Sequence, residues 1–526
     1  MEVAIPRRQL SQRAICIALF LMLLGTYGYA RQQNGPNQTS RLAALHAIVL
    51  EGHASIDSYE KMTVDKAFYK GHYYSEKAPG IVLLALPAYM AGKVPTFVCV
   101  KIGLCTQTAW NVIAWFATTG SVGLVTAFGG VFFYVLACNF APRRWAFLST
   151  IALFLGSGMF SYATMLFSHA ASASLLLISL ALVLDTGKKK KKNNFRVPAR
   201  LREFLTAFFI GSVGCLAILL PLPWQLLSAI VFAALYFALY FFIPEAVSLK
   251  FRKYAAWLVD PTVLAGAAAG YAVISEYPTA LIGLALAALA LGQGWKKLML
   301  FVAGAALPLF VFLCFNIYAF GVPFMVGYAY SAWPIPAEMP SSFYGFRLPS
   351  LTSAWILLFS PARGLFFWSP FLLLAVAGVR DVYRINKSLC IGFLITFVVY
   401  VTFISCHLQP DGGAALGPRH LTPIVPILGI FAACGFRRFP WLGSILMTLS
   451  LLLTGIATLV SAMAPERISY PLNQYYIPVL MSGKIAPNLG LTAGLPAVLS
   501  ILFPVVVLLL IGGWIAGHLP SDQTQE

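Results

Sequence analysis

The sequence has 526 residues, of which 60% are hydrophobic and only 10% are charged. Because soluble globular proteins contain about 25% charged residues, this composition excludes a soluble globular chain and indicates a membrane protein with many spans. The formal net charge of +19 would suit nucleic acid, but the positions of the basic residues favour membrane lipids as partners and no nucleic acid.

The first apolar run extends from Ala14 to Ala30 and follows Arg7, Arg8 and Arg13. A signal peptide has this charge pattern, but no small-residue cleavage site stands out here and many further apolar runs follow. We therefore interpret the run as a retained first transmembrane helix with a cytoplasmic N-terminus.

A long segment that we expect to be exported follows, at residues 31–109. Apolar residues at helical spacing predict a helix over residues 40–50, whereas the apolar run at 80–93 is short for a span and is interrupted by proline. We expect both to lie along the outer membrane interface. The segment is rich in acidic residues, which are Glu51, Asp57, Glu60, Asp65 and Glu76.

Apolar runs of about 20 residues predict the transmembrane helices. The predicted fold class is all-α: a polytopic membrane protein with about 12–14 transmembrane helices and a large first exported loop that carries interfacial helices. The spans are expected near residues 13–30, 110–137, 145–163, 165–184, 203–222, 224–243, 262–276, 278–292, 296–318, 362–379, 388–406, 421–434, 440–462 and 493–516.

Most of the 36 Lys and Arg residues fall in connections that share one side if the topology alternates. The positive-inside rule identifies that side as the cytoplasm. The run Lys188–Lys192 is then an anchor on anionic lipid headgroups. Cys99 and Cys105 share an outer loop and could form a disulfide.

Scarce polar residues at the outer ends of spans mark a candidate site. "LFSHA" contains His169, "SPARG" contains Arg363, and "GPRHLTP" contains Arg419 and His420. Cations at an outer membrane surface suit phosphate recognition, although an exposed Arg can instead only anchor the chain to headgroups. Glu276 in "SEYPTA" is either functional or a cap in a re-entrant turn.

The segment "GHYYSEKAPG" at residues 71–80 places a polar cluster directly before an apolar run. Its glycines and proline permit a turn that brings polar groups to a lipid headgroup; alternatively, Ser75 caps a helix whose first turn contains Glu76. His72 and Glu76 are four residues apart and could share a divalent metal ion, although two ligands do not make a site, and no further cofactor is indicated. With Glu276, the residues expected to line a substrate pocket are His72, Tyr73 and Tyr74.

Taken in order, these motifs resemble the GT-C superfamily of membrane glycosyltransferases, and in particular the bacterial members that are similar to protein O-mannosyltransferases and to the aminoarabinose transferases of lipid A. The resemblance spans roughly residues 13–435, so we divide the chain into a GT-C-like transmembrane catalytic region (1–435) and C-terminal transmembrane helices with an exported loop (436–526). The motifs are "SRLAALHAIVLEGHASIDSYEKMTVDKAFYKGHYYSEKAPG", "LFSHA", "SEYPTA", "FNIYAFGVPFMVGYAY", "FSPARGLFFWSP" and "GPRHLTPIVP".

The resemblance implies an enzyme of the cytoplasmic membrane whose active site faces the exterior or periplasm. It would transfer a hexosyl or pentosyl group, with inversion, from a polyprenyl-phosphate donor to a glycan, lipid or protein acceptor. In such enzymes a carboxylate of the first exported loop is the general base, and cations neutralise the departing phosphate. The residues expected to bind the donor phosphate are Lys77, which matches the family's phosphate-facing lysine, His169, Arg363, Arg419 and His420.

The family commonly has an acidic residue just after the first helix, but residues 31–41 contain none. The candidate bases are therefore Asp57 and Asp65, with a slight preference for Asp57.

Two other functions compete with glycosyl transfer. A transporter should carry ionisable residues at mid-membrane and a trace of repeated halves, and neither is visible. A polysaccharide polymerase or ligase would depend on arginines of late loops, whereas the acidic residues here are early. Neither a P-loop nor a Rossmann fingerprint is present, which disfavours an ATP-driven pump.

Overall fold

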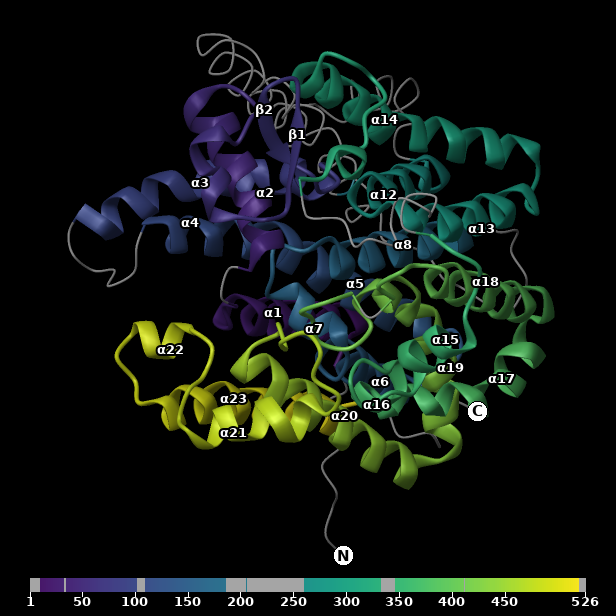
Figure 1. Ribbon diagram of the computed structural model, residues 1–526. Helices are drawn as coiled ribbons and strands as arrows, with labels where there is room; N and C mark the ends of the chain where they lie inside the picture. Colours follow the sequence, from purple (N-terminus) through teal and green to yellow (C-terminus); the bar gives the residue numbers. More distant parts are fainter. Residues whose placement is uncertain are drawn as a thin grey trace, which may run out of the picture.

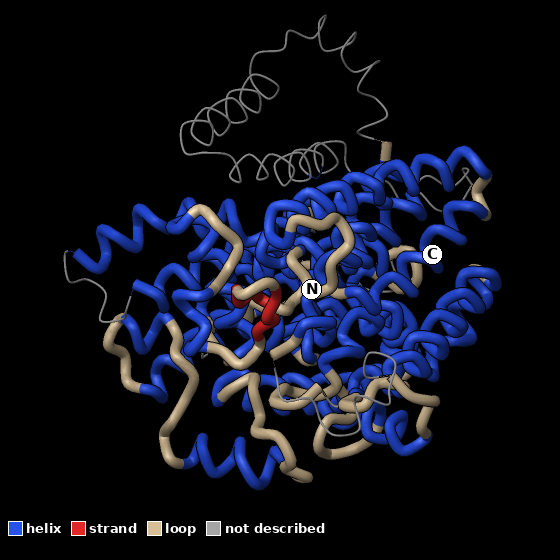
Figure 2. The backbone as a smooth tube through the Cα atoms, turned by 45° about the horizontal axis from the view of Figure 1, so that its top comes forward, coloured by secondary structure: helices blue, strands red, loops and turns tan. Residues whose placement is uncertain are grey.

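The computed structural model describes residues 10–32, 35–101, 109–185, 205, 260–332, 346–410 and 412–519. Figures 1 and 2 show helices throughout this part of the chain and one small β-hairpin. Nine helices among the described residues are long and apolar enough to cross a membrane, which confirms the predicted helical, multi-pass membrane protein. These are Gln12–Tyr29, Gly80–Val98, Ala109–Ala137, Ser168–Asp185, Trp295–Phe320, Lys387–Ser405, Arg419–Arg438, Pro440–Val460 and Ala497–Gly517.

The helix that follows "GHYYSEKAPG" is longer than the sequence suggested. Helix α3 (Gly80–Lys101) has 22 residues and contains Pro87 and Pro95. Our interfacial helix at 80–93 is therefore too short. Proline removes one backbone hydrogen bond and would end most helices in water, but an apolar surrounding favours a continued helix because the other backbone groups have no alternative partner.

Two predicted spans are interrupted in the structure, and two others are shorter than a full span. The expected helix at 145–163 divides into α6 (Arg143–Leu155) and α7 (Gly158–Ala163). The spans expected at 262–276 and 278–292 correspond to two shorter apolar helices joined by a 3-10 turn. Residues 362–379 form several short pieces. The bounds of all these elements are α12 (Pro261–Ser275), η6 (Tyr277–Thr279), α13 (Ala280–Leu291), α16 (Leu365–Trp368), η8 (Pro370–Leu373) and α17 (Leu374–Ile385).

Some predictions lie outside the described residues. These are the spans near 203–222 and 224–243, the run Lys188–Lys192, and Cys105 of the suggested disulfide.

The first exported segment folds into helices and a hairpin that the sequence did not reveal. Strands β1 (Lys66–Tyr69) and β2 (His72–Ser75) pair antiparallel, with Tyr69 opposite His72. The two turn residues, Lys70 and Gly71, both have positive φ, which is the geometry of a type I′ turn and explains the glycine. The segment also contains α2 (Pro36–His46), the π-helical turn η1 (Ala47–Glu51) and the 3-10 turn η2 (Asp57–Met62).

The hairpin corrects one interpretation of the motif. Ser75 is the last residue of β2, and α3 begins at Gly80. Ser75 therefore does not cap a helix that has Glu76 in its first turn. Glu76 and Lys77 instead lie in the connection between the hairpin and α3.

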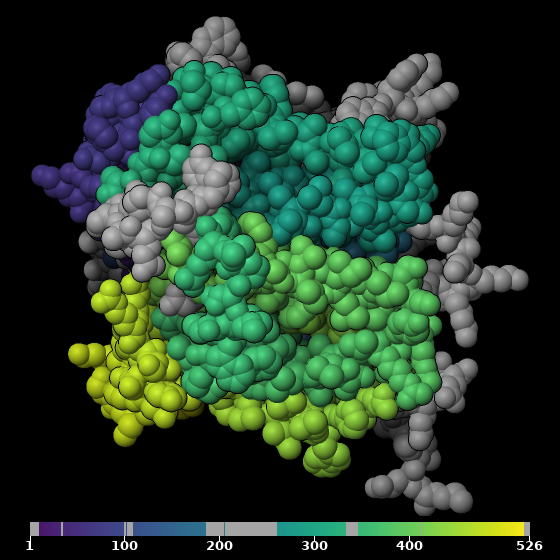
Figure 3. All heavy atoms as spheres, turned by 45° about the vertical axis from the view of Figure 1, so that its right-hand side comes forward, coloured from purple at the N-terminus to yellow at the C-terminus, as the bar shows by residue number. Residues whose placement is uncertain are grey.

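Helix α8 (Ser168–Asp185) is largely buried and contacts both α5 (Leu124–Ala137) and α12. Helix α14 (Trp295–Phe320) packs on α12, and α17 packs on α19 (Val425–Arg438). In Figure 3 the teal surface of α12 to α14 lies above the green surface of residues 350–440, and a groove separates the two. The other elements are α1 (Gln12–Tyr29), α4 (Ala109–Thr118), η3 (Thr119–Gly123), η7 (Gly327–Tyr330), α15 (Leu351–Leu358), α18 (Lys387–Ser405), η9 (Arg419–Ile424), α20 (Pro440–Val460), η10 (Leu472–Tyr476), α21 (Ile477–Met481), α22 (Leu489–Thr492) and α23 (Ala497–Gly517).

Candidate active site

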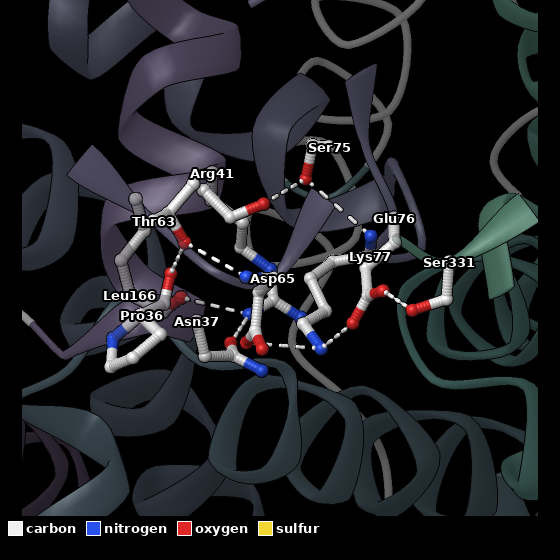
Figure 4. A network of polar contacts seen from close by, with 11 residues as sticks. Pro36, Asn37, Arg41, Thr63, Asp65, Ser75, Glu76, Lys77, Leu166 and Ser331 are labelled. Carbon is white, nitrogen blue, oxygen red and sulfur yellow. Dashed lines mark hydrogen bonds and ion pairs between the residues drawn. The ribbon is translucent and has the colours of Figure 1, made fainter. Parts of the chain in front are cut away.

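Lys77 lies at the centre of a buried polar network (Figure 4). Its Nζ is 2.6 Å from Glu76 Oε1 and 3.0 Å from Asp65 Oδ2. Burial alone would lower the pKa of Lys77, but interactions with Tyr328, Asp65 and Glu76 outweigh the burial and raise the pKa. Lys77 is therefore a fixed positive charge in the protein interior.

Short polar side chains hold this network in place. The hydroxyls of Ser75 and Ser40 are 2.7 Å apart, which joins the hairpin to α2, and Ser75 Oγ accepts a hydrogen bond from the backbone N–H of Lys77 at 3.4 Å. On the other side, Ser331 Oγ donates to Glu76 Oε2 at 2.5 Å. The network thus joins α2, the hairpin and the segment after η7, so Lys77 has little freedom to move (Figure 4).

A small pocket lies beside Lys77, with a cavity volume of about 20 Å³, which is the space of roughly one water molecule. Its polar lining consists of Tyr74, Ser75, Lys77, Tyr277 and Asn316. Most of the remaining wall is apolar and comes from α2, α3 and the end of α14; it includes Ala44, Val82, Phe315, Ala319, Phe320 and Met325. A polar end beside an apolar wall suits an amphipathic ligand.

A second cluster joins three segments that are distant in the sequence. His169 lies in the first turn of α8, Glu276 connects α12 to η6, and His420 lies in η9. The Nδ1 atoms of His169 and His420 are 3.3 Å and 4.0 Å from the Glu276 carboxylate oxygens. Ser168 Oγ donates a hydrogen bond to the same carboxylate.

The two clusters adjoin and share cations. Burial raises the pKa of Glu276, whereas the hydrogen bond from Ser168 and the charges of Arg41, Arg419 and Lys77 oppose this increase. The guanidinium carbons of Arg41 and Arg419 are 6.0 Å and 5.8 Å from the centre of the Phe167 ring. The site therefore combines three cations with several carboxylates, next to the pocket.

The structure separates the two candidate bases. Asp65 contacts Lys77 and so belongs to the buried network. Asp57 instead accepts hydrogen bonds from the backbone N–H of Tyr73 and from His72 Nδ1, both at 2.7 Å, at the exposed side of the hairpin. Its carboxylate fastens η2 to β2.

The two residues that were expected to share a metal ion, His72 and Glu76, each have a different partner in the structure. Glu76 is bound by Lys77 and Ser331, whereas His72 pairs with Asp57. Among the predicted pocket residues, Tyr74 lines the pocket, and Tyr73 places its ring 4.6 Å from Lys66 Nζ.

Arg363 was expected to bind phosphate, but its side chain is occupied. Its guanidinium donates to the backbone carbonyls of Ala362, Gly413 and Pro465 at 3.0–3.2 Å. Because these carbonyls come from different loops, Arg363 ties the loops together.

Three residues of the site were not singled out from the sequence. Arg41 is the one Lys or Arg of α2 and donates to Asn37 Oδ1 and, at 3.4 Å, to the carbonyl of Leu166. A lone cation in an amphipathic helix was a usable signal. No sequence signal pointed to Ser168 or Tyr328, because serine and tyrosine are common elsewhere in the chain.

No family model and no curated protein matches this chain. Solved structures do match. ArnT from Cupriavidus metallidurans bound to undecaprenyl phosphate is 15% identical with a TM-score of 0.48, over 96% of this chain and 72% of that one. The apo state of the same protein is 14% identical with a TM-score of 0.46, over 96% of this chain and 71% of that one. The apo oligosaccharyltransferase from Archaeoglobus fulgidus is 12% identical with a TM-score of 0.35, over 97% of this chain and 57% of that one.

Both matched proteins are GT-C glycosyltransferases, the superfamily that the sequence motifs resemble. A likeness of this degree carries no conclusion about activity or substrate. Those depend on the geometry of the site.

Proposed function

We propose that the protein is a membrane glycosyltransferase that transfers a sugar, with inversion, from a polyprenyl-phosphate donor to an acceptor at the outer face of the membrane. The observation that carries this proposal is the position of Lys77, a buried cation at the polar end of a largely apolar pocket and 3.0 Å from a carboxylate.

The donor phosphate would bind Lys77, with Arg41 and Arg419 nearby. As the bond between the sugar C1 and the phosphate oxygen breaks, its electron pair passes to the phosphate. Cations that are already fixed in a site of low polarity stabilise that developing charge without reorganisation. The apolar wall formed by α3 and the end of α14 would take the first isoprene units of the lipid.

Asp65 is the general base that the geometry favours over Asp57. In the inverting reaction the acceptor oxygen bonds to C1 on the face opposite the phosphate, and its proton passes to the carboxylate. A bound phosphate would compete with Asp65 for Lys77 and thereby release the carboxylate for the acceptor. Asp57 is already committed to Tyr73 and His72.

The length of α14 supports an outward-facing site. Lys296 and Lys297 are in its first turn, whereas Phe315, Ala319 and Phe320, which line the pocket, are at its other end. A 26-residue helix is about 39 Å long, so the two ends lie on opposite sides of a membrane. If the basic end is cytoplasmic, the pocket faces outward. Cysteine labelling at Ser58 and Asn193 should then report opposite sides; labelling from the same side would contradict this topology.

Reconstituted protein tests the reaction itself. We expect vesicles that contain the protein and a radiolabelled polyprenyl-phosphate sugar to form a glycosylated product when membrane extract supplies the acceptor. Mass spectrometry of glycans and glycolipids from a deletion strain should identify the missing product. Movement of intact donor across the bilayer without any transfer would instead favour a lipid-linked sugar transporter, and chain extension of a glycan would favour a polymerase or ligase.

A further inference from the structure

We propose that His169, Glu276 and His420 bind a divalent transition-metal ion, for which Zn²⁺ is the best fit. Each residue offers one ligand atom, and these atoms all lie within 4.8 Å of one another. The three residues come from α8, the α12–η6 junction and η9, so a bound ion would join segments that are far apart in the sequence.

The donor set agrees with zinc chemistry. Two imidazoles and one carboxylate are a common protein ligand set for Zn²⁺ and leave a fourth position open. Tetrahedral bonds of about 2.0–2.2 Å place neighbouring ligand atoms roughly 3.3–3.6 Å apart. The separations between the Glu276 oxygens and the two His Nδ1 atoms are 3.3 Å and 4.0 Å, and all the ligand atoms lie within 4.8 Å of one another, so side-chain rotations would have to bring the wider pairs closer.

His169 is poorly satisfied without an ion. Its side chain is buried, with a relative exposure of 4%. Within the described part of the chain its Nδ1 makes no hydrogen bond, although Glu276 Oε2 lies 3.3 Å away. An unpaired polar atom in the interior is costly, and a metal ion would use its lone pair.

Ser168 supplies the outer support that metal sites commonly have. Its hydroxyl donates to Glu276 Oε2, which orients the carboxylate towards His169. Partners of this kind hold the ligands in the binding geometry.

The surrounding charges indicate that a bound metal ion would carry an anion. Arg41, Arg419 and Lys77 all act on Glu276, so three cations face a site with one carboxylate. These charges disfavour a dication alone and favour one that carries an anion in its open position. Inorganic phosphate should therefore tighten metal binding.

Metal binding can be measured directly on the purified full-length protein in detergent after treatment with a chelator. We expect calorimetry with Zn²⁺ and elemental analysis after desalting to give one ion per chain. Binding should be lost in Glu276→Gln and in His169→Ala, and Ser168→Ala should weaken it by roughly 10- to 100-fold. Unchanged binding in both Glu276→Gln and His169→Ala would overturn the proposal.

His53→Ala is the matched control. His53 Nε2 is 3.2 Å from Glu51 Oε2, but this pair is exposed and is not part of a three-ligand cluster among the described residues. Zinc binding should be unchanged in this variant. Loss of binding in His53→Ala with retention in His169→Ala would place the ion elsewhere.

Co²⁺ provides a test that needs no variant. Co²⁺ bound by two imidazoles and one carboxylate should show the visible ligand-field absorption that is typical of four- or five-coordinate cobalt. Addition of Zn²⁺ should displace the cobalt and abolish this absorption. Absence of this absorption in the wild type would overturn the site even if the variants fail to fold. Because no measurement uses glycosyl transfer, failure of the metal site leaves the proposed reaction untouched.

Discussion

Two acid–base pairs of the exported segment have similar geometry and very different surroundings. His72 Nδ1 is 2.7 Å from Asp57 Oδ2, and Lys77 Nζ is 3.0 Å from Asp65 Oδ2. The side chains of the first pair are 59% and 42% exposed, whereas those of the second are 8% and 20% exposed. Exposed pairs contribute about 0–1 kcal/mol, but removing one partner of a buried pair costs about 3–5 kcal/mol.

The comparison teaches that separation alone does not identify a functional pair. Water screens the pair at the hairpin turn, where Asp57 mainly accepts the backbone N–H of Tyr73. Lys77 instead lines the pocket, and Arg41 lies close enough to Asp65 to interact with its charge. A buried charge is costly to maintain, so the second pair is the one that we expect to have a role in catalysis.

The largest effect should separate the two carboxylates. Asp65→Asn keeps the size of the side chain but removes a base, and a general base contributes roughly 100- to 10,000-fold to the rate. We expect a loss of turnover in that range for Asp65→Asn and nearly wild-type turnover for Asp57→Asn, measured as initial rates with a polyprenyl-phosphate sugar. The opposite ranking would make Asp57 the base and the comparison misleading.

A smaller effect on turnover is expected when Lys77 is replaced. Lys77→Ala should reduce kcat by roughly 100- to 1,000-fold, because it removes one preorganised charge that faces the leaving phosphate. Lys61→Ala is the matched control, since Lys61 lies in the same exported segment but is exposed. Both variants should elute as monodisperse protein. Wild-type turnover in Lys77→Ala would reduce Lys77 to a structural partner of Asp65 and Glu76.

The smallest effect concerns stability and pH. Partial burial would raise the pKa of Asp57, but hydrogen bonds from Tyr73 and His72 outweigh it and hold the pKa below its ordinary value of 3.8. Because the folded-state pKa is depressed, Asp57 stabilises the protein above the unfolded-state pKa and loses this contribution as the pH falls through the folded-state value. The contribution is under about 1 kcal/mol, since the pair is exposed.

Thermal unfolding of the wild type and Asp57→Asn should therefore differ slightly at pH 6 and converge as the pH falls through the folded-state pKa of Asp57. A difference that stays constant over this range would mean that Asp57 acts through its shape and not through its charge.

Much of the site could be predicted because polar residues are scarce in this chain. His169, Glu276, Arg419 and His420 lie at ends of apolar runs, and the structure brings all four together. A charged side chain is costly inside a bilayer, so such residues are confined to the few places where partners or water are available.

Other features could not be read from local patterns. Asp57 and Asp65 are similar in sequence context, and only the fold of the hairpin turns one to solvent and the other to Lys77. Arg363 resembles a phosphate ligand until its three carbonyl partners are known. The sequence predicted too short an α3, because proline usually ends a helix in a soluble protein, whereas α3 continues through both Pro87 and Pro95.

The sequence by itself determined the membrane character, the helical class and the segments that carry chemistry, because hydropathy and the cost of buried charge act along the chain. The tertiary structure decided which carboxylate meets Lys77, which arginines are occupied by backbone carbonyls, and that Glu276 lies between two histidines from distant segments. These outcomes depend on how helices pack. The contacts that define the site join α2, α8, α12 and η9, and no local pattern encodes the distance between them.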